Sequence, residues 1–433
     1  MSTQPTRTIQ VAALTRVEGE GALRVVVEGQ QVTSVQLAIY EPPRFFEALL
    51  RGRPLENTPD ITARICGICP VAYQMTAVHA LEQALGIHIT PEIRLLRRLL
   101  YCGEWIESHG VHMHLLHIPD FFGCANSIEL ARSYPTEVTR GLRIKKLGNR
   151  LLELLGGRAV HPISVAVGGF YRPPRKPELL AFREELKAGL ADAIAVAHWV
   201  FGFTFPEFHR DYEMVALHHP DEYPMNEGRI VSTRHLDISA SEFPLHFEER
   251  QVPHSTALQC VRLPEATEYF VGPLARINLN RELLSPIARQ LADEAFVSWP
   301  CFNPYRSIVA RAIEVVFAFE EAIRLIDSYD GCSPARIDYT PRAGEGAWAT
   351  EAPRGLIYHR YQTTDDGKIA HATIVPPTSQ NQRQIEQDLT QLLPSILHQS
   401  DTEVALACER LIRSYDPCIS CSTHFLRLEI ERR

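Results

Sequence analysis

The sequence predicts an α+β fold: a predominantly helical body with a small antiparallel β meander at its start and a β-containing insertion near its middle. Residues 9–40 alternate β-forming side chains around a turn at 28–31, as an antiparallel meander does. Residues 211–260 are irregular and rich in His, Pro and Glu, with short strand-like pieces. Several other stretches space their apolar residues three or four apart, which is typical of amphipathic helices: 45–52, 92–110, 141–157, 177–201, 305–329 and 382–399.

No internal repeat and no low-complexity linker divides the chain, so we expect one domain over residues 1–433. The last helix has the clearest limits, because Ser400 and Glu403 can form a capping box at its start and Asp416–Pro417 ends it. Along the chain we expect the meander in 1–40, helices with a first cysteine pair in 41–210, the insertion in 211–260, helices with a second cysteine pair in 261–424, and a tail in 425–433.

Composition excludes several classes of protein. The 44 basic and 52 acidic residues leave a net charge of −8, which offers no broad positive surface for nucleic acid. The longest uncharged run, residues 65–81, is shorter than the ~20 apolar residues that a membrane-spanning helix needs. The N-terminus does not have the pattern of a secretory signal, and the 10 cysteines are too sparse for a disulfide scaffold. We therefore expect neither nucleic acid nor a membrane span.

Two Cys-x-x-Cys pairs stand 352 residues apart: Cys66 and Cys69 in RICGICP, and Cys418 and Cys421 in DPCISCSTH. Where such a pair precedes a helix, its two sulfurs aim at one point and the free helix amides favour thiolates. A structural zinc site, a thioredoxin-like redox pair, an iron–sulfur cluster and unconnected core cysteines all compete as interpretations. Soft thiolates favour nickel, copper, zinc or iron, but the spacing does not identify the metal.

Both cysteine motifs resemble the two signatures of nickel–iron hydrogenase large subunits, and they do so as a linked pair. The continuation CPVAY and the short chain resemble the soluble, cytoplasmic, NAD(P)-linked bidirectional or sulfhydrogenase group. The resemblance extends over most of the chain through RVEG at 16–19, RFFEALLRGR at 44–53, SHGVHMHLLHIPDFF at 108–122, GGRAVHPISVAVGGF at 156–170, EAPRG at 351–355 and VPPTSQN at 375–381.

The resemblance implies the catalytic subunit of a hydrogenase, which splits H2 reversibly and heterolytically into protons and electrons. All four cysteines would bind nickel, and Cys69 and Cys421 would also bridge to an iron that carries carbonyl and cyanide. Cys418, which does not bridge, would be the first proton acceptor. Two rival interpretations remain: a non-catalytic metal–thiolate scaffold and a hydrogen-sensing subunit of the same fold.

The same resemblance gives five further residues a role around the metals. Glu18 in RVEG would relay the proton outward, although a carboxylate at a strand turn needs no function. Arg354 would lie over the open metal position, where Asp120 and Asp416 would hold it; without the family it would be an ordinary salt-bridge residue. Thr378 would donate a hydrogen bond to cyanide, after one proline more than the common pattern has.

Glu47 and His424 would bind a second metal, magnesium or iron, that ties the C-terminus to the first helix; magnesium keeps several waters there. The family commonly has a histidine where this chain has Tyr73, which leaves a hydrogen bond to the bridging thiolate in doubt. The histidines at 109, 112, 114 and 117 fit packing and hydrogen bonding better than metal binding. The remaining cysteines are expected to be small buried hydrophobic residues: Cys102, Cys124, Cys260, Cys301, Cys332 and Cys408.

Several partners are implied as well. The chain has no spare cysteine set for iron–sulfur clusters and no Gly-x-Gly-x-x-Gly before a helix, so the clusters, flavin and NAD(P) would belong to other subunits. These would be a small iron–sulfur subunit and flavin-containing diaphorase subunits. Nickel-insertion factors and an endopeptidase that removes the tail after His424 would act during maturation, in the cytoplasm.

Overall fold

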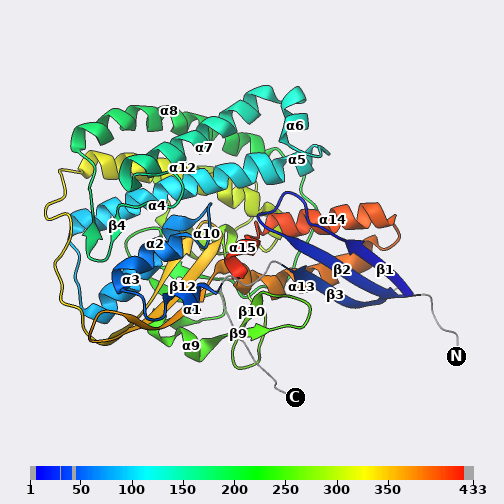
Figure 1. The fold of residues 1–433 in the computed structure, drawn as a ribbon. Helices are drawn as coiled ribbons and strands as arrows, with labels where there is room; N and C mark the ends of the chain where they lie inside the picture. The colour runs from blue at the N-terminus through cyan, green and yellow to red at the C-terminus, as the bar shows by residue number, and fades with distance from the viewer. Residues whose placement is uncertain (1–5, 30, 41–44, 424–433) are drawn as a thin grey trace, which may run out of the picture.

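The chain begins with a three-stranded antiparallel sheet, as predicted. The computed structural model describes residues 6–29, 31–40 and 45–423, and its first sheet has the order β1 (Thr6–Val11), β2 (Gly21–Glu28), β3 (Gln31–Ile39). Alternate residues of β2 are buried, so one face of the sheet packs on protein. The sheet contacts α13 (Pro377–Ile396) and α14 (Asp401–Ser414), so the first three strands lie beside two helices from the last quarter of the chain (Figure 1).

Four long helices form a layer across the top of Figure 1: α4 (Pro91–Val111), α7 (Pro135–Gly156), α8 (Lys176–Phe201) and α12 (Ser307–Ser328). Helix α4 packs on both α7 and α12, and α12 packs on α8. The approach of α7 to α4 requires glycine, because a Cβ at Gly148 would lie 2.8 Å from the carbonyl oxygen of Gly103. These helices confirm the predicted helical body.

A second sheet lies beneath this layer, where the sequence analysis expected only helices within residues 261–424. It consists of β11 (Gly344–Ala352), β12 (Gly355–Thr363) and β13 (Ile369–Val375), paired in that order. Helix α3 (Pro70–Leu85) packs on β11 and β12. Most residues of β12 are buried, so the strand lacks the alternation of polar and apolar residues by which strands are recognised in sequences.

The predicted insertion contains strands. One small sheet has the order β6 (Val215–His218), β7 (Arg229–Ser232), β8 (Asp237–Ile238), and a second pairs β9 (Phe247–Gln251) with β10 (Leu258–Arg262). The other α-helices and strands are α1 (Phe46–Leu50), α2 (Thr58–Ala63), α5 (Ile118–Phe121), α6 (Ser127–Ser133), β4 (Val165–Ala166), β5 (Gly169–Phe170), α9 (Phe243–His246), α10 (Pro273–Asn280), α11 (Pro286–Glu294) and α15 (Ile419–Ser422).

Local signals at the helix ends agree with the sequence. The capping box of Ser400 and Glu403 is formed at the start of α14, and α7 ends against Gly157 with φ 79°.

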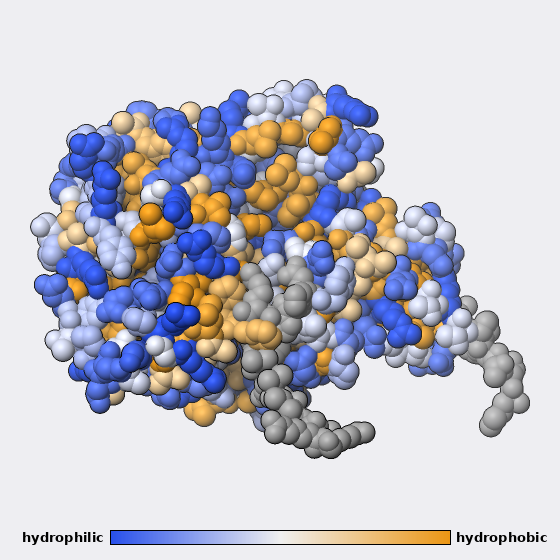
Figure 2. All heavy atoms as spheres, viewed as in Figure 1, coloured by the Kyte–Doolittle hydropathy of each residue, from blue (hydrophilic) through white to orange (hydrophobic). Residues whose placement is uncertain are grey.

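Polar and apolar residues are mixed on the face that Figure 2 shows. Within the described residues, no helix is both long enough and apolar enough to cross a membrane.

Candidate metal centre

The fold brings the two distant cysteine pairs together. The sulfur atoms of Cys66, Cys69, Cys418 and Cys421 all lie within 4.8 Å of one another, and all four residues are buried. The Sγ–Sγ distances are 3.5 Å from Cys66 to Cys418 and 3.7 Å from Cys69 to Cys421, and none of the four forms a disulfide. Four converging soft donors suit nickel and iron, so the residues present fit the metals that the sequence implied.

The first pair is held by the start of α3. Cys69 is the residue before the helix, and the Cys66 sulfur accepts the backbone N–H groups of Ile68 at 3.3 Å and of Cys69 at 3.2 Å. The buried carboxylate of Glu104 on α4 accepts the N–H groups of Val71 and Ala72 at 2.6 and 3.1 Å. Glu104, which the sequence analysis missed, therefore caps the helix that positions Cys69.

The second pair is held by the N-terminal segment. The N–H of Ile419 donates to the backbone oxygen of Glu18 at 2.9 Å, which joins the Cys418 loop to the segment after β1. The N–H of Cys418 donates to the hydroxyl of Thr378, at the start of α13, at 3.1 Å. Contacts across about 400 residues of sequence thus determine where the Cys418 sulfur points.

Glu18 touches the predicted proton acceptor directly. The thiol of Cys418 donates to Glu18 Oε2 at 3.0 Å, and the N–H of Ser420 donates to the same oxygen at 3.0 Å. Cys418 is fully buried, whereas Glu18 is half-buried. The carboxylate therefore lies between the sulfur cluster and the surface.

Arg354 is buried next to the cysteines, in the turn between β11 and β12. It donates to the backbone oxygen of Asp416 at 2.9 Å, to Asp416 Oδ1 at 3.1 Å and to the hydroxyl of Ser108 at 3.4 Å. Burial opposes the charge on Arg354, but Asp416 and the cysteine sulfurs outweigh it and raise the pKa of the guanidinium well above its usual value. Arg354, Thr378 and Asp416 line one small recess.

The expectation that Asp120 also holds Arg354 is wrong. The Asp120 carboxylate binds Arg413 through both of its oxygens, at 2.7 and 2.9 Å, and also pairs with Arg16. The second group on Arg354 is Ser108, which stands first in the SHGVH motif. A six-residue π-helical turn at His112–His117 separates Ser108 from Asp120. That irregular turn changes the helical register between the two residues, so Ser108 and Asp120 meet different partners.

The charge of the sulfur cluster is unevenly distributed. Burial opposes ionisation of Cys66, but the hydrogen bonds from the neighbouring thiols, Cys418 first, hold its pKa well below the usual value. Burial raises the pKa of the Cys418 thiol well above it. Cys66 is therefore the member of the cluster on which the neighbouring groups favour the thiolate.

Glu47 lies on α1 and is half-buried rather than on an exposed helix face. Its Oε1 accepts the N–H of Ile374 on β13 at 2.7 Å. Burial raises its pKa to about 7, against the effect of that N–H and of Arg51. His424, the expected second ligand of this site, and the tail that follows it lie outside the described residues.

The remaining predictions from the sequence concern the histidines at 109 and 112, Tyr73 and the cysteines outside the cluster. His109 binds Glu314 at 2.9 Å and His112 binds the backbone oxygen of Arg413 at 2.8 Å, so both serve in packing and hydrogen bonding. The hydroxyl of Tyr73 is buried and has no hydrogen-bond partner among the described residues. Of the cysteines outside the cluster, Cys102, Cys260, Cys301 and Cys408 are buried as expected, whereas Cys124 and Cys332 are half-buried.

Comparisons with known proteins agree with this geometry. The sequence profile of the nickel-dependent hydrogenase family matches residues 44–140 and 271–424. The chain is 31% identical over 428 residues to sulfhydrogenase 1 subunit alpha of Pyrococcus furiosus, covering 97% of this chain and 98% of that one. It is 27% identical over 467 residues to the NAD-reducing hydrogenase HoxS subunit beta of Cupriavidus necator, covering 97% and 95%.

A solved structure shares the fold. The crystal structure of an NAD+-reducing [NiFe]-hydrogenase in the H2-reduced state superimposes with a TM-score of 0.87 at 23% identity, covering 96% of this chain and 99% of that one. One assignment follows from the four buried cysteines in one cluster, the family profile over more than half of the sequence, and relatives matched over 95% or more of their length. The chain belongs to the nickel-dependent hydrogenase family, as its large, catalytic subunit.

Proposed function

We propose that this chain splits H2 reversibly into two protons and two electrons at a nickel–iron centre held by Cys66, Cys69, Cys418 and Cys421. The contact between Cys418 Sγ and Glu18 Oε2, at 3.0 Å, carries the proposal. Heterolytic cleavage needs a base beside the metal and a route for the proton away from it. This pair of residues supplies both.

When bound, a nickel–iron centre would supply the Lewis acidity that polarises H2 and the capacity to accept its two electrons, and its iron would carry carbonyl and cyanide. The Cys418 thiolate would accept the two protons of H2 one after the other. Glu18 would take each proton over the 3.0 Å contact, and its half-buried position leads toward solvent. The N–H of Ser420 keeps the Glu18 carboxylate aimed at the sulfur throughout.

The recess beside the cysteines orients the small ligands. Asp416 holds the guanidinium of Arg354 at two points, so that a fixed cation faces the cluster. The oxygen of Thr378 accepts the N–H of Cys418, which leaves its own proton available as a donor to cyanide. Asp120 does not contact this recess, because its carboxylate binds Arg413 and Arg16.

A second metal, magnesium or iron, would use the Glu47 carboxylate together with His424. The Glu47 carboxylate, which the N–H of Ile374 holds in a half-buried position, supports this part of the proposal. The endopeptidase cut after His424 would free that residue for the site once nickel has been inserted.

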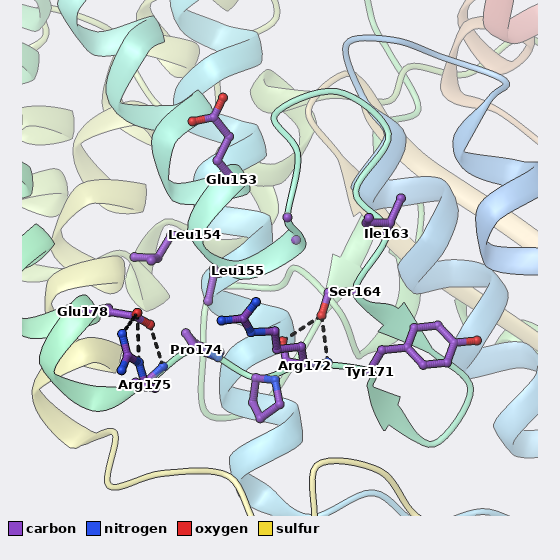
Figure 3. Close-up of a pocket in the computed structure, with 13 residues that line it drawn as sticks. Glu153, Leu154, Leu155, Ile163, Ser164, Tyr171, Arg172, Pro174, Arg175 and Glu178 are labelled. Carbon is purple, nitrogen blue, oxygen red and sulfur yellow. Dashed lines mark hydrogen bonds and ion pairs between the residues drawn. The ribbon is translucent and has the colours of Figure 1, made fainter.

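The electrons leave through a small iron–sulfur subunit. Cys66 and Cys69 are buried, but Gly67 between them is exposed, so the chain reaches the surface one residue from Cys66. The neighbouring loop exposes apolar side chains: Val160, which would lie 3.9 Å from a Cβ at Gly67, is 49% exposed and Ile163 is 47% exposed. Ile163 also borders a cavity of about 520 Å³ between the end of α7 and the start of α8 (Figure 3). These features suit a partner that places its cluster over Gly67.

Diaphorase subunits with flavin would pass the electrons to NAD or NADP in the cytoplasm. The support is the similarity to a relative described as NAD-reducing. Among the described residues, the four cysteines are the one group of three or more His, Cys, Asp or Glu side chains that could hold a metal. This group is assigned to nickel and iron, so the iron–sulfur clusters are assigned to the partners.

Replacing Glu18 by glutamine tests the proton route in the purified complex. Glu18→Gln keeps the size of the side chain but removes the base, so H2-dependent dye reduction should fall by about 10²- to 10⁴-fold. Infrared bands of metal-bound carbonyl and cyanide should remain, because the metals stay bound. The exposed Glu20, two residues away, serves as the matched control, and Glu20→Gln should retain wild-type rates.

Other outcomes would support the rival functions. Zinc alone in the wild-type complex, with no infrared bands, would indicate a structural scaffold. Nickel and iron with almost no turnover would indicate a hydrogen sensor. An unchanged rate in Glu18→Gln would exclude Glu18 as the relay.

A further inference from the structure

The position of Arg354 depends on the backbone of the turn that carries it. Strand pairing ends at Ala352 and Gly355, so Pro353 and Arg354 form a two-residue turn. The turn lies against Gly272, where a Cβ would stand 3.0 Å from the Arg354 backbone oxygen. Whatever fixes this backbone also determines where the guanidinium points.

Arg276 on α10 binds the turn at three successive residues. Its guanidinium donates to the carboxylate of Glu351 at 2.9 Å and to the backbone oxygens of Ala352 at 2.8 Å and Pro353 at 3.0 Å. These are the three residues directly before Arg354. The Arg276 side chain is fully buried, so water does not compete for these contacts.

Arg276 is itself held rigidly. Its Nε and Nη2 donate to the two oxygens of Glu314 on α12, each at 2.7 Å, and its guanidinium lies 4.5 Å from the ring centre of Trp105 on α4. His109 at 2.9 Å and the hydroxyl of Tyr223 at 2.7 Å hold the same carboxylate. Burial opposes ionisation of Glu314, but Arg276 outweighs it and lowers its pKa to about 2, so the pair stays charged.

We propose that Arg276 is the positioning residue for Arg354: it anchors the β11–β12 turn to α4, α10 and α12 and so holds the Arg354 guanidinium over the cysteine cluster. Lysine cannot replace it, because one ammonium cannot bind a carboxylate through two parallel hydrogen bonds and also reach two backbone oxygens. The inference rests on the proposed role of Arg354, but the anchoring itself is measurable without that role.

The test compares Arg276→Lys with Arg97→Lys in the purified complex. Arg97 is equally buried and also binds a carboxylate, that of Glu82, and a backbone oxygen, that of Ala166, but these lie away from the turn. Arg276→Lys should make amide hydrogen exchange in residues 351–356 about tenfold faster or more, shift the infrared cyanide bands, and lower H2-dependent dye reduction by about 10- to 100-fold. Arg97→Lys should lower thermal stability without these three effects.

Equal effects of the two variants would overturn the proposal, because Arg276 would then serve stability alone. Unchanged exchange at the turn would overturn it too, whatever the activity. Faster exchange with unchanged activity, together with a fully active Arg354→Lys, would instead count against the proposed role of Arg354. If Arg276→Lys does not fold, Tyr223→Phe, which removes one hydroxyl from Glu314, should still speed exchange at the turn, and no change there would refute the anchoring.

Discussion

Thr378 should influence the centre through two hydrogen bonds. Thr378→Val keeps the shape but leaves the buried N–H of Cys418 without its acceptor, which should cost about 1–3 kcal/mol of stability. It should also shift the infrared cyanide bands, since the proposed donor is lost. Thr378→Ser keeps the hydroxyl and should leave the bands in place; the same shift in both variants would exclude the hydroxyl as the donor.

Short motifs predicted most of the side chains at the centre, but not all of their contacts. The four cysteines, Glu18, Arg354 and Asp416 were identified from short motifs, and the structure brings them into contact or close proximity. Asp120 was misassigned, because a carboxylate has several possible arginine partners in a sequence. Ser108 and Glu104 were missed, because an uncharged hydroxyl and a helical glutamate give no signal in a sequence.

Helices α4 and α12 are joined by a buried ion pair as well as by packing. Arg98 on α4 donates to Glu321 on α12 at 2.6 Å, and Arg324 binds both oxygens of the same carboxylate at 2.7 Å. Burial opposes ionisation of Glu321, but the two arginines lower its pKa to about 2, below the usual value of 4.5. One ionised carboxylate therefore joins α4 to α12.

Glu321→Gln should destabilise the helix layer in a pH-dependent way. Because the folded-state pKa is lowered, the carboxylate stabilises the fold above about pH 4.5, and this contribution is lost as the pH falls through about 2. Denaturant unfolding at pH 7 should show a loss of about 3 kcal/mol in the variant. The difference from wild type should shrink steadily toward pH 2, and a loss independent of pH would contradict the prediction.

An exposed pair is the matched control for this experiment. Glu184 binds Arg183 at the surface, where solvent screens the charges. Glu184→Gln should therefore unfold at the same denaturant concentration as wild type at every pH.

At the scale of the whole molecule, the surface around Gly67 is the proposed interface with the iron–sulfur subunit. The exposed Gly67, with Val160 beside it and Ile163 three residues further along the same loop, is the proposed exit for electrons. Ile163→Asp would place a charge on this apolar surface and should reduce co-purification of the iron–sulfur subunit by about tenfold. Ile128 on α6 is 77% exposed, so Ile128→Asp should leave co-purification unchanged. Equal loss in both variants would move the interface elsewhere.

The C-terminal tail gives a second prediction at this scale. Mass spectrometry of the active complex should find the chain ending at His424, because the proposed second metal site needs that residue freed from the tail. Nickel-depleted cells should accumulate the full-length chain. Active complex that still ends at Arg433 would contradict the cut.

The sequence by itself determined the metal-binding residue types, the β meander, the long helices and the capping box of α14, because each depends on residues close together in the chain. Tertiary structure alone decided that four sulfurs from positions 66 to 421 meet within 4.8 Å, that Asp120 binds Arg413 instead of Arg354, and that Arg276 holds the turn before Arg354. It also decided that residues 344–375 form a buried sheet. Such contacts join residues far apart in sequence, and packing of the whole chain, rather than any local preference, selects them.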